Sequence, residues 1–149
     1  MNALWGATDS DYANKLAPAL AFPWTSPTGR TVWQLRPATA YKKADGSGAK
    51  YMFQKDVRIP LHTERAGTGP VVIVEGTKQV RAVAHYAPTD YGVYGLAGCQ
   101  NWLEDGLPTT DLAVVENRPV IVIMDADRTT NPQVWAAAKS LQTALNAEG

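Results

Sequence analysis

The chain has 149 residues, of which 45% are hydrophobic and 19% are charged, and its formal net charge is zero. This composition is typical of one compact globular protein with at most a small appendage, and it excludes a disordered chain or a globally basic nucleic-acid binder. The single cysteine, Cys99, excludes an internal disulfide and a zinc site built from cysteines. No apolar run approaches the roughly 20 residues that span a bilayer, and no signal-peptide pattern is present, so we expect no membrane association and a reducing, cytoplasmic setting.

The first 29 residues are weakly patterned. Residues 9–17 are expected to form a short helix that ends before Pro18. Residues 22–24 and 27–29 each contain a proline and are expected to form irregular chain and a turn, with the aromatic side chains packed on the body of the protein.

Residues 30–58 are basic and rich in aromatic side chains. The alternation at 31–36 predicts a strand, and residues 50–53 are expected to return as a second strand after a flexible turn at 44–49. This segment contains seven lysines and arginines but only two aspartates, an excess of five positive charges. Basic groups beside aromatic rings suit single-stranded nucleic acid, although a solvated hairpin with a core of aromatic residues would give the same pattern. The candidate nucleic-acid contacts are Arg30, Arg36, Lys42, Lys43 and Lys50.

A polar, glycine-containing linker at 64–69 predicts a division of the chain into residues 1–69 and 70–149. After the linker, residues 70–74 predict a buried strand that ends in Glu75 and Gly76, and residues 77–86 predict a helix. A small basic β subdomain is therefore expected to precede an α/β domain.

Further α/β elements follow along the chain. Residues 91–94 predict a shorter strand, residues 107–117 are ambiguous, and the five apolar residues Val120–Met124 predict a strand buried on both faces. Asn131 and Pro132 form an N-cap and first-turn signal for a last helix. The apolar face of that helix consists of Val134, Ala138, Leu141 and Leu145. This order predicts a mostly parallel sheet, flanked by helices and connected by right-handed crossovers.

Acidic residues follow two of these predicted parallel strands. Glu75 ends the first strand, and Asp125 and Asp127 follow the last. Because the carboxyl ends of parallel strands meet at one edge of a sheet, the three side chains can converge. Carboxylate oxygens are hard ligands that suit Mg²⁺ or Mn²⁺, and such a metal can position and polarise a phosphoryl group. Glu75 could share the metal or act as general acid or base. An acid at a strand end can instead cap the following turn, and for one such residue that is the simpler explanation.

These acidic motifs carry a resemblance to a known family. Residues Val72–Gly76, followed by Ile121–Asp127, resemble the Toprim domain of bacterial-type primases and topoisomerases, which pairs a glutamate after its first strand with Asp-x-Asp after its third. The chain is most similar to Toprim-like domains in replication proteins of phages, plasmids and integrated elements. The motifs that carry this likeness over about residues 25–149 are Glu75-Gly76-Thr77-Lys78, Gly95-Leu96-Ala97-Gly98 with Trp102, Thr130-Asn131-Pro132, Pro27 to Arg36, and Lys50-Tyr51.

The resemblance implies a Toprim-like (Rossmann-like) fold and the metal-dependent domain of a DNA primase in replication of a mobile element. It implies metal binding by Asp125 and Asp127, and a general acid/base or metal role for Glu75. Lys78, with Gly76, would face phosphate or substrate. The implied partners are single-stranded DNA template, nucleotides and a helicase-type ATPase region of the same parent protein.

Two departures from the family pattern qualify these expectations. Primases usually carry another acid four residues after the glutamate, and here that position is Gln79. The chain also ends at Gly149, where the fold normally adds another strand, which implies a fragment truncated at its C-terminal end.

Three alternatives stay open. The segment Asp125–Thr129 also matches the first motif of haloacid-dehalogenase-type phosphatases, in which the first aspartate is a nucleophile. Those enzymes need a lysine and further acids well downstream, where this chain offers only Lys139 and Glu148, so that chemistry would require a permuted chain. The Toprim-like domain could also be a non-catalytic nucleic-acid-binding module. Lastly, it could be a nuclease, because the same metal can activate water.

Overall fold

The computed structural model divides the chain into two compact units. The N-terminal unit comprises residues 1–24 and 31–59, and the α/β unit comprises residues 25–30 and 60–149. Within them the structure describes residues 18–42, 46, 48–54, 56–125 and 131–148. The division falls before the linker predicted at 64–69, because the strand that includes residues 62–65 pairs within the sheet of the α/β unit. The helix expected at 9–17 lies outside the described residues.

The described part of the N-terminal unit contains short strands. A three-stranded sheet has the order β1 (Ala19–Thr25), β2 (Thr31–Pro37) and β5 (Met52–Phe53), and β2 pairs with β5 antiparallel. A separate hairpin joins β3 (Tyr41–Lys42) to β4 (Gly48–Ala49). The strand expected at 31–36 and its return near residues 52–53 are thus confirmed.

The expectation of irregular chain at residues 22–24 was wrong, because these residues belong to β1. The strand lies at the edge of its sheet, where a proline such as Pro23 costs no ladder hydrogen bond on the open side. Trp24 is fully buried and meets the Phe53 ring edge-on, with 5.7 Å between ring centroids. The proline suggested loop, but the burial of Trp24 favours a strand.

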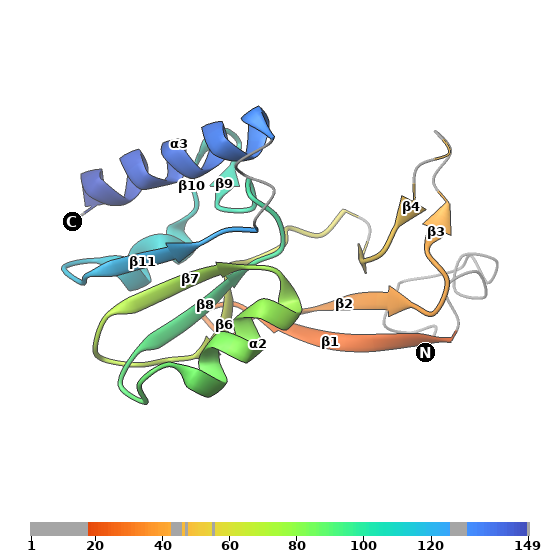
Figure 1. The fold of residues 1–149 in the computed structure, drawn as a ribbon, viewed down its shortest axis with the longest axis horizontal. Coiled ribbons are helices and arrows are strands. Elements are labelled where there is room, and N and C mark those ends of the chain that lie inside the picture. Colours follow the sequence, from red (N-terminus) through yellow and green to blue (C-terminus); the bar gives the residue numbers. More distant parts are fainter. Residues whose placement is uncertain (1–17, 43–45, 47, 55, 126–130, 149) are drawn as a thin grey trace. The chain divides into compact units, whose positions relative to one another are not determined.

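The α/β unit contains a four-stranded sheet (Figure 1). Its order is β11 (Val120–Ile123), β7 (Val71–Glu75), β8 (Gly92–Leu96) and β6 (His62–Arg65). The β11–β7 and β7–β8 pairs are parallel, and β6 adds an antiparallel edge to β8. The predicted α/β class is confirmed, with a mixed sheet in which the parallel pairs contain both strands that precede the acidic residues.

In the residues of this unit that the structure describes, the other elements are two helices, a 3₁₀ turn and a small hairpin. Their bounds are α2 (Thr77–Tyr86), β9 (Leu103–Glu104), β10 (Leu107–Pro108), η2 (Thr110–Val115) and α3 (Pro132–Glu148). The N-cap predicted at Asn131 is confirmed, since its side-chain Oδ1 accepts a hydrogen bond from the Gln133 backbone N–H at 3.1 Å. Among the described residues, no helix has the length and hydrophobicity needed to cross a membrane.

The two helices pack on opposite faces of the sheet (Figure 1). On one face, Val80 of α2 packs with Val72, Val74 and Val93. On the other face, α3 and η2 pack over alternate residues of the same strands. That second cluster includes Val71, Ile73, Leu96, Leu112, Val115, Leu141 and Leu145. The helices that come next in the chain after the neighbouring strands β7 and β11 therefore lie on opposite faces of the sheet, and this arrangement is a topological switch point of an α/β sheet.

The prediction that the strand at 120–124 is buried on both faces was wrong. It forms the outer strand of the sheet, and Ile121 and Ile123 are 47% and 41% exposed. Val120 and Val122, which point the other way, pack against the cluster under α3. An apolar run predicts a strand, but it does not distinguish a strand inside a sheet from one at its edge.

Candidate functional site

Glu75 and Asp125 meet at the carboxyl edge of the sheet. The parallel register sets Ile123 opposite Val74, so that both strands end together. Oε2 of Glu75 accepts a hydrogen bond from the backbone N–H of Asp125 at 3.3 Å. The Asp125 side chain is exposed and Glu75 is half-buried, so both face the edge rather than the core. Asp127, the third predicted acid, lies outside the described residues.

Gly76 makes the sharp turn from β7 into α2. Its φ of 98° lies in the left-handed region, its N–H donates to the Leu96 carbonyl at 2.8 Å, and its carbonyl accepts from the Val80 N–H at 3.0 Å. A Cβ at this position would collide with the side-chain amide of Gln79. Glycine is therefore favoured here both by the positive φ and by the lack of space for a Cβ. The turn that it makes holds Glu75 next to the start of α2.

We predict that Gly76→Ala lowers the free energy of unfolding by about 1–3 kcal/mol, because it adds backbone strain and displaces Gln79. Chemical denaturation followed by circular dichroism would measure the change. Gly106→Ala is a matched control, since Gly106 also has a positive φ, 81°, but has open space where its Cβ would be. Equal losses in the two variants would mean that the contact with Gln79 has no energetic role.

Gln79 contacts the acidic pair directly. Its Nε2 donates a hydrogen bond to Oδ1 of Asp125 at 3.1 Å, from the first turn of α2. The sequence marked this residue only as a departure from the family's acidic position. The structure instead places a neutral amide against the Asp125 carboxylate, where it orients the carboxylate without adding negative charge. Sequence reasoning missed this role, although Gln79, one helical turn beyond Glu75, had the spacing to suggest it.

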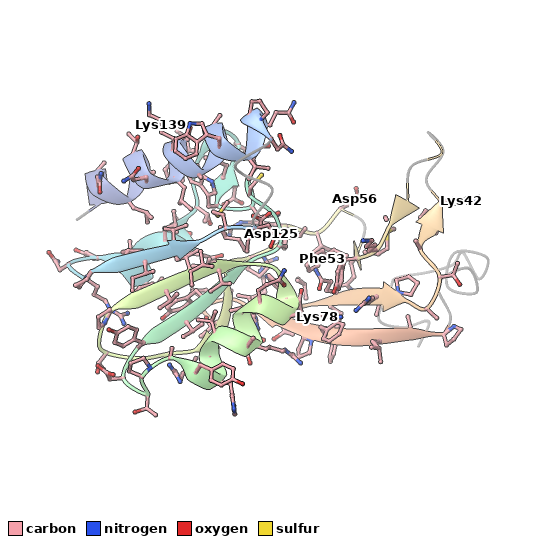
Figure 2. The ribbon with its side chains drawn as sticks, in the orientation of Figure 1. Lys42, Phe53, Asp56, Lys78, Asp125 and Lys139 are labelled. Atoms are coloured by element: carbon pink, nitrogen blue, oxygen red, sulfur yellow. The ribbon has the colours of Figure 1, made fainter. Side chains whose placement is uncertain are left out.

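Lys78 also lies in the first turn of α2 (Figure 2). The side chain is exposed, as is that of Asp125, which Figure 2 labels where the chain leaves β11. The predicted contacts of Lys78 and Gly76 with phosphate or substrate stay predictions.

The five predicted nucleic-acid contacts do not all belong to one unit. Arg36, Lys42 and Lys50 lie in the N-terminal unit, Arg30 lies in the turn that belongs to the α/β unit, and Lys43 lies outside the described residues. The guanidinium carbon of Arg36 is 5.6 Å from the centroid of the Tyr51 ring, a cation–π contact. Lys42 and Lys50 are exposed.

The acidic pair fits a hard divalent cation in ligand chemistry. Mg²⁺ is commonly held by one or two carboxylates and keeps several waters, and Glu75 and Asp125 supply carboxylates from adjacent strand ends. Within the described residues, no group of three or more histidine, cysteine, aspartate or glutamate side chains could hold a metal. The described part of the site therefore contributes two carboxylates, to which Asp127 would add a third.

No family model, curated protein or solved structure matches this chain.

Proposed function

We propose that the α/β unit is a Toprim-like (Rossmann-like) domain that performs metal-dependent nucleotidyl transfer as part of a cytoplasmic DNA primase. The observation that carries this proposal is the meeting of Glu75 and Asp125 at the switch point of the sheet. Ligands of open α/β sheets bind outside the carboxyl ends of the strands at such a point. The acids also have the order, glutamate first and Asp-x-Asp later, of the family that the sequence resembles.

The proposed roles of Asp127 and Lys78 rest on the resemblance of the sequence, and those of Glu75, Gln79 and Asp125 rest also on their contacts at the sheet edge. Asp125 and Asp127 bind Mg²⁺ or Mn²⁺, and Gln79 orients Asp125 through its amide. When bound, the metal supplies charge that positions and polarises the triphosphate. Glu75 either shares the metal or takes the proton of the attacking 3′-hydroxyl, while pyrophosphate leaves the incoming nucleotide. Lys78 neutralises phosphate charge from the first turn of α2.

A primer-synthesis assay tests the proposal. The chain would be incubated with single-stranded DNA, nucleoside triphosphates including one labelled nucleotide, and Mg²⁺ or Mn²⁺. We expect labelled oligonucleotides that require both template and metal. Shortening of an end-labelled template without synthesis would assign hydrolysing chemistry to the same site. If the chain yields neither labelled oligonucleotides nor a shortened template, the proposal of an active enzyme is contradicted.

A non-catalytic binding module is the second candidate. It is favoured by the amide of Gln79 at the position where primases usually have an acid, by the Arg36–Tyr51 pair, and by the exposure of Lys42 and Lys50 in the same unit. Such a module would bind a fluorescent single-stranded oligonucleotide in a salt-sensitive manner and would yield no product in either assay.

A further inference from the structure

The side chain of Gln79 lies across the turn that joins β7 to α2. A Cβ on Gly76 would collide with the amide group of Gln79, so this amide occupies space that the glycine leaves open. From there Nε2 of Gln79 donates to Oδ1 of Asp125 at 3.1 Å. An ionised carboxylate only accepts hydrogen bonds, which fixes the NH₂ end of the amide toward Asp125. Gly76 and Gln79 together therefore engage one particular oxygen of Asp125.

Each carboxylate of the acidic pair has one oxygen in a hydrogen bond to the protein. Oδ1 of Asp125 accepts from Gln79, and Oε2 of Glu75 accepts from the backbone N–H of Asp125 at 3.3 Å. A cation that approached either of these oxygens would also meet the positive end of the N–H dipole that points at it. At most one oxygen of each carboxylate therefore remains well placed to bind a cation.

This arrangement distinguishes between small and large divalent cations. Mg²⁺ demands near-ideal octahedral geometry, keeps several waters and is held by one or two carboxylates. Mn²⁺ likewise suits six oxygen ligands in octahedral geometry. Ca²⁺ takes about 6–8 oxygen ligands in a more flexible geometry, and it often uses both oxygens of one carboxylate. Two carboxylates that each offer a single oxygen therefore suit Mg²⁺ or Mn²⁺ better than Ca²⁺.

We propose that Gln79 sets the cation selectivity of the acidic pair, favouring Mg²⁺ and Mn²⁺ over Ca²⁺. This inference rests on the proposed metal site, and it gives Gln79 a role beyond orienting Asp125. By donating to Oδ1, the amide prevents Asp125 from offering both of its oxygens to a larger ion. Because the amide is neutral, it does so without adding a negative charge, which would attract every divalent cation.

Calorimetric titrations with Mn²⁺ alone and with Ca²⁺ alone test this selectivity. The native chain is expected to bind Mn²⁺ more tightly than Ca²⁺. The variant Gln79→Met keeps an unbranched side chain of similar length beside Gly76 but removes the N–H donor. Mn²⁺ binding should weaken because Asp125 loses its orienting partner, and Ca²⁺ binding should not weaken because a second oxygen of Asp125 is released. The ratio of the Ca²⁺ to the Mn²⁺ dissociation constant should fall by about 10- to 100-fold, the effect typical of outer partners of metal ligands.

Gln142→Met is the matched control, because it makes the same change at an exposed glutamine of α3. This control should keep the native ratio, and circular dichroism should show the same fold in all three proteins. If the native chain binds Mn²⁺ but the ratio is unchanged in Gln79→Met, the selectivity role is overturned and the metal site stands. The same conclusion follows if the native chain binds Ca²⁺ as tightly as Mn²⁺. Absence of Mn²⁺ binding by the native chain would overturn the metal site itself and the selectivity role with it.

Discussion

Replacing Asp125 with asparagine is expected to abolish metal-dependent nucleotidyl transfer and to leave the fold intact. The asparagine Oδ1 can still accept the hydrogen bond from Gln79, and the backbone N–H can still donate to Glu75, so the local contacts persist. Only the negative charge is lost. Mutating the outer partners of metal ligands typically costs about 10- to 100-fold in affinity or activity, and loss of a ligand itself should cost at least as much.

Initial rates of primer synthesis at saturating metal would measure this loss, with circular dichroism to compare the folds. Asp105→Asn is a matched control, because it makes the same chemical change at an exposed carboxylate in the turn between β9 and β10. That control should retain the native rate. Full activity in Asp125→Asn would remove Asp125 from the site, and an unfolded variant would make the acid a structural residue.

Truncating Leu141 is expected to cause a large loss of stability. The residue is fully buried in the cluster that joins α3 to the sheet, where Ile73, Leu96 and Trp102 are also buried. Leu141→Ala removes apolar volume there and leaves a cavity, and such changes typically cost about 2–5 kcal/mol. Urea denaturation would measure the change in the free energy of unfolding.

Gln142→Ala is the control on the same helix. Gln142 is exposed, so its truncation should change stability by no more than about 0.5 kcal/mol. A loss for Leu141→Ala as small as that of the control would contradict the packing of α3 on the sheet, because a docked helix cannot lose its most buried leucine without cost.

Local signals in the sequence predicted several elements well. The helix at 77–86 has the predicted bounds, because an apolar run ending in Glu75-Gly76 indicates both a strand end and a turn into a helix. The apolar face of the last helix was also predicted, and Val134, Leu141 and Leu145 are buried. In these segments, periodicity and capping residues carry most of the information.

Features that depend on tertiary neighbours could not be predicted. The edge position of β11 follows from the order of strands in the sheet, which its own residues do not encode. The strand character of residues 22–24 depends on the packing of Trp24 with Phe53. The contact of Gln79 with Asp125 joins residues 46 positions apart, and only the folded sheet brings them together.

Calorimetric titration of the chain with Mn²⁺ tests the proposed metal site most directly. The native chain would be compared with a double variant, Asp125→Asn with Asp127→Asn, of equal helicity. We expect saturable Mn²⁺ binding by the native chain and loss of this binding in the variant. Absence of binding in both, even with nucleotide or single-stranded DNA present, would contradict the metal site and favour the binding module.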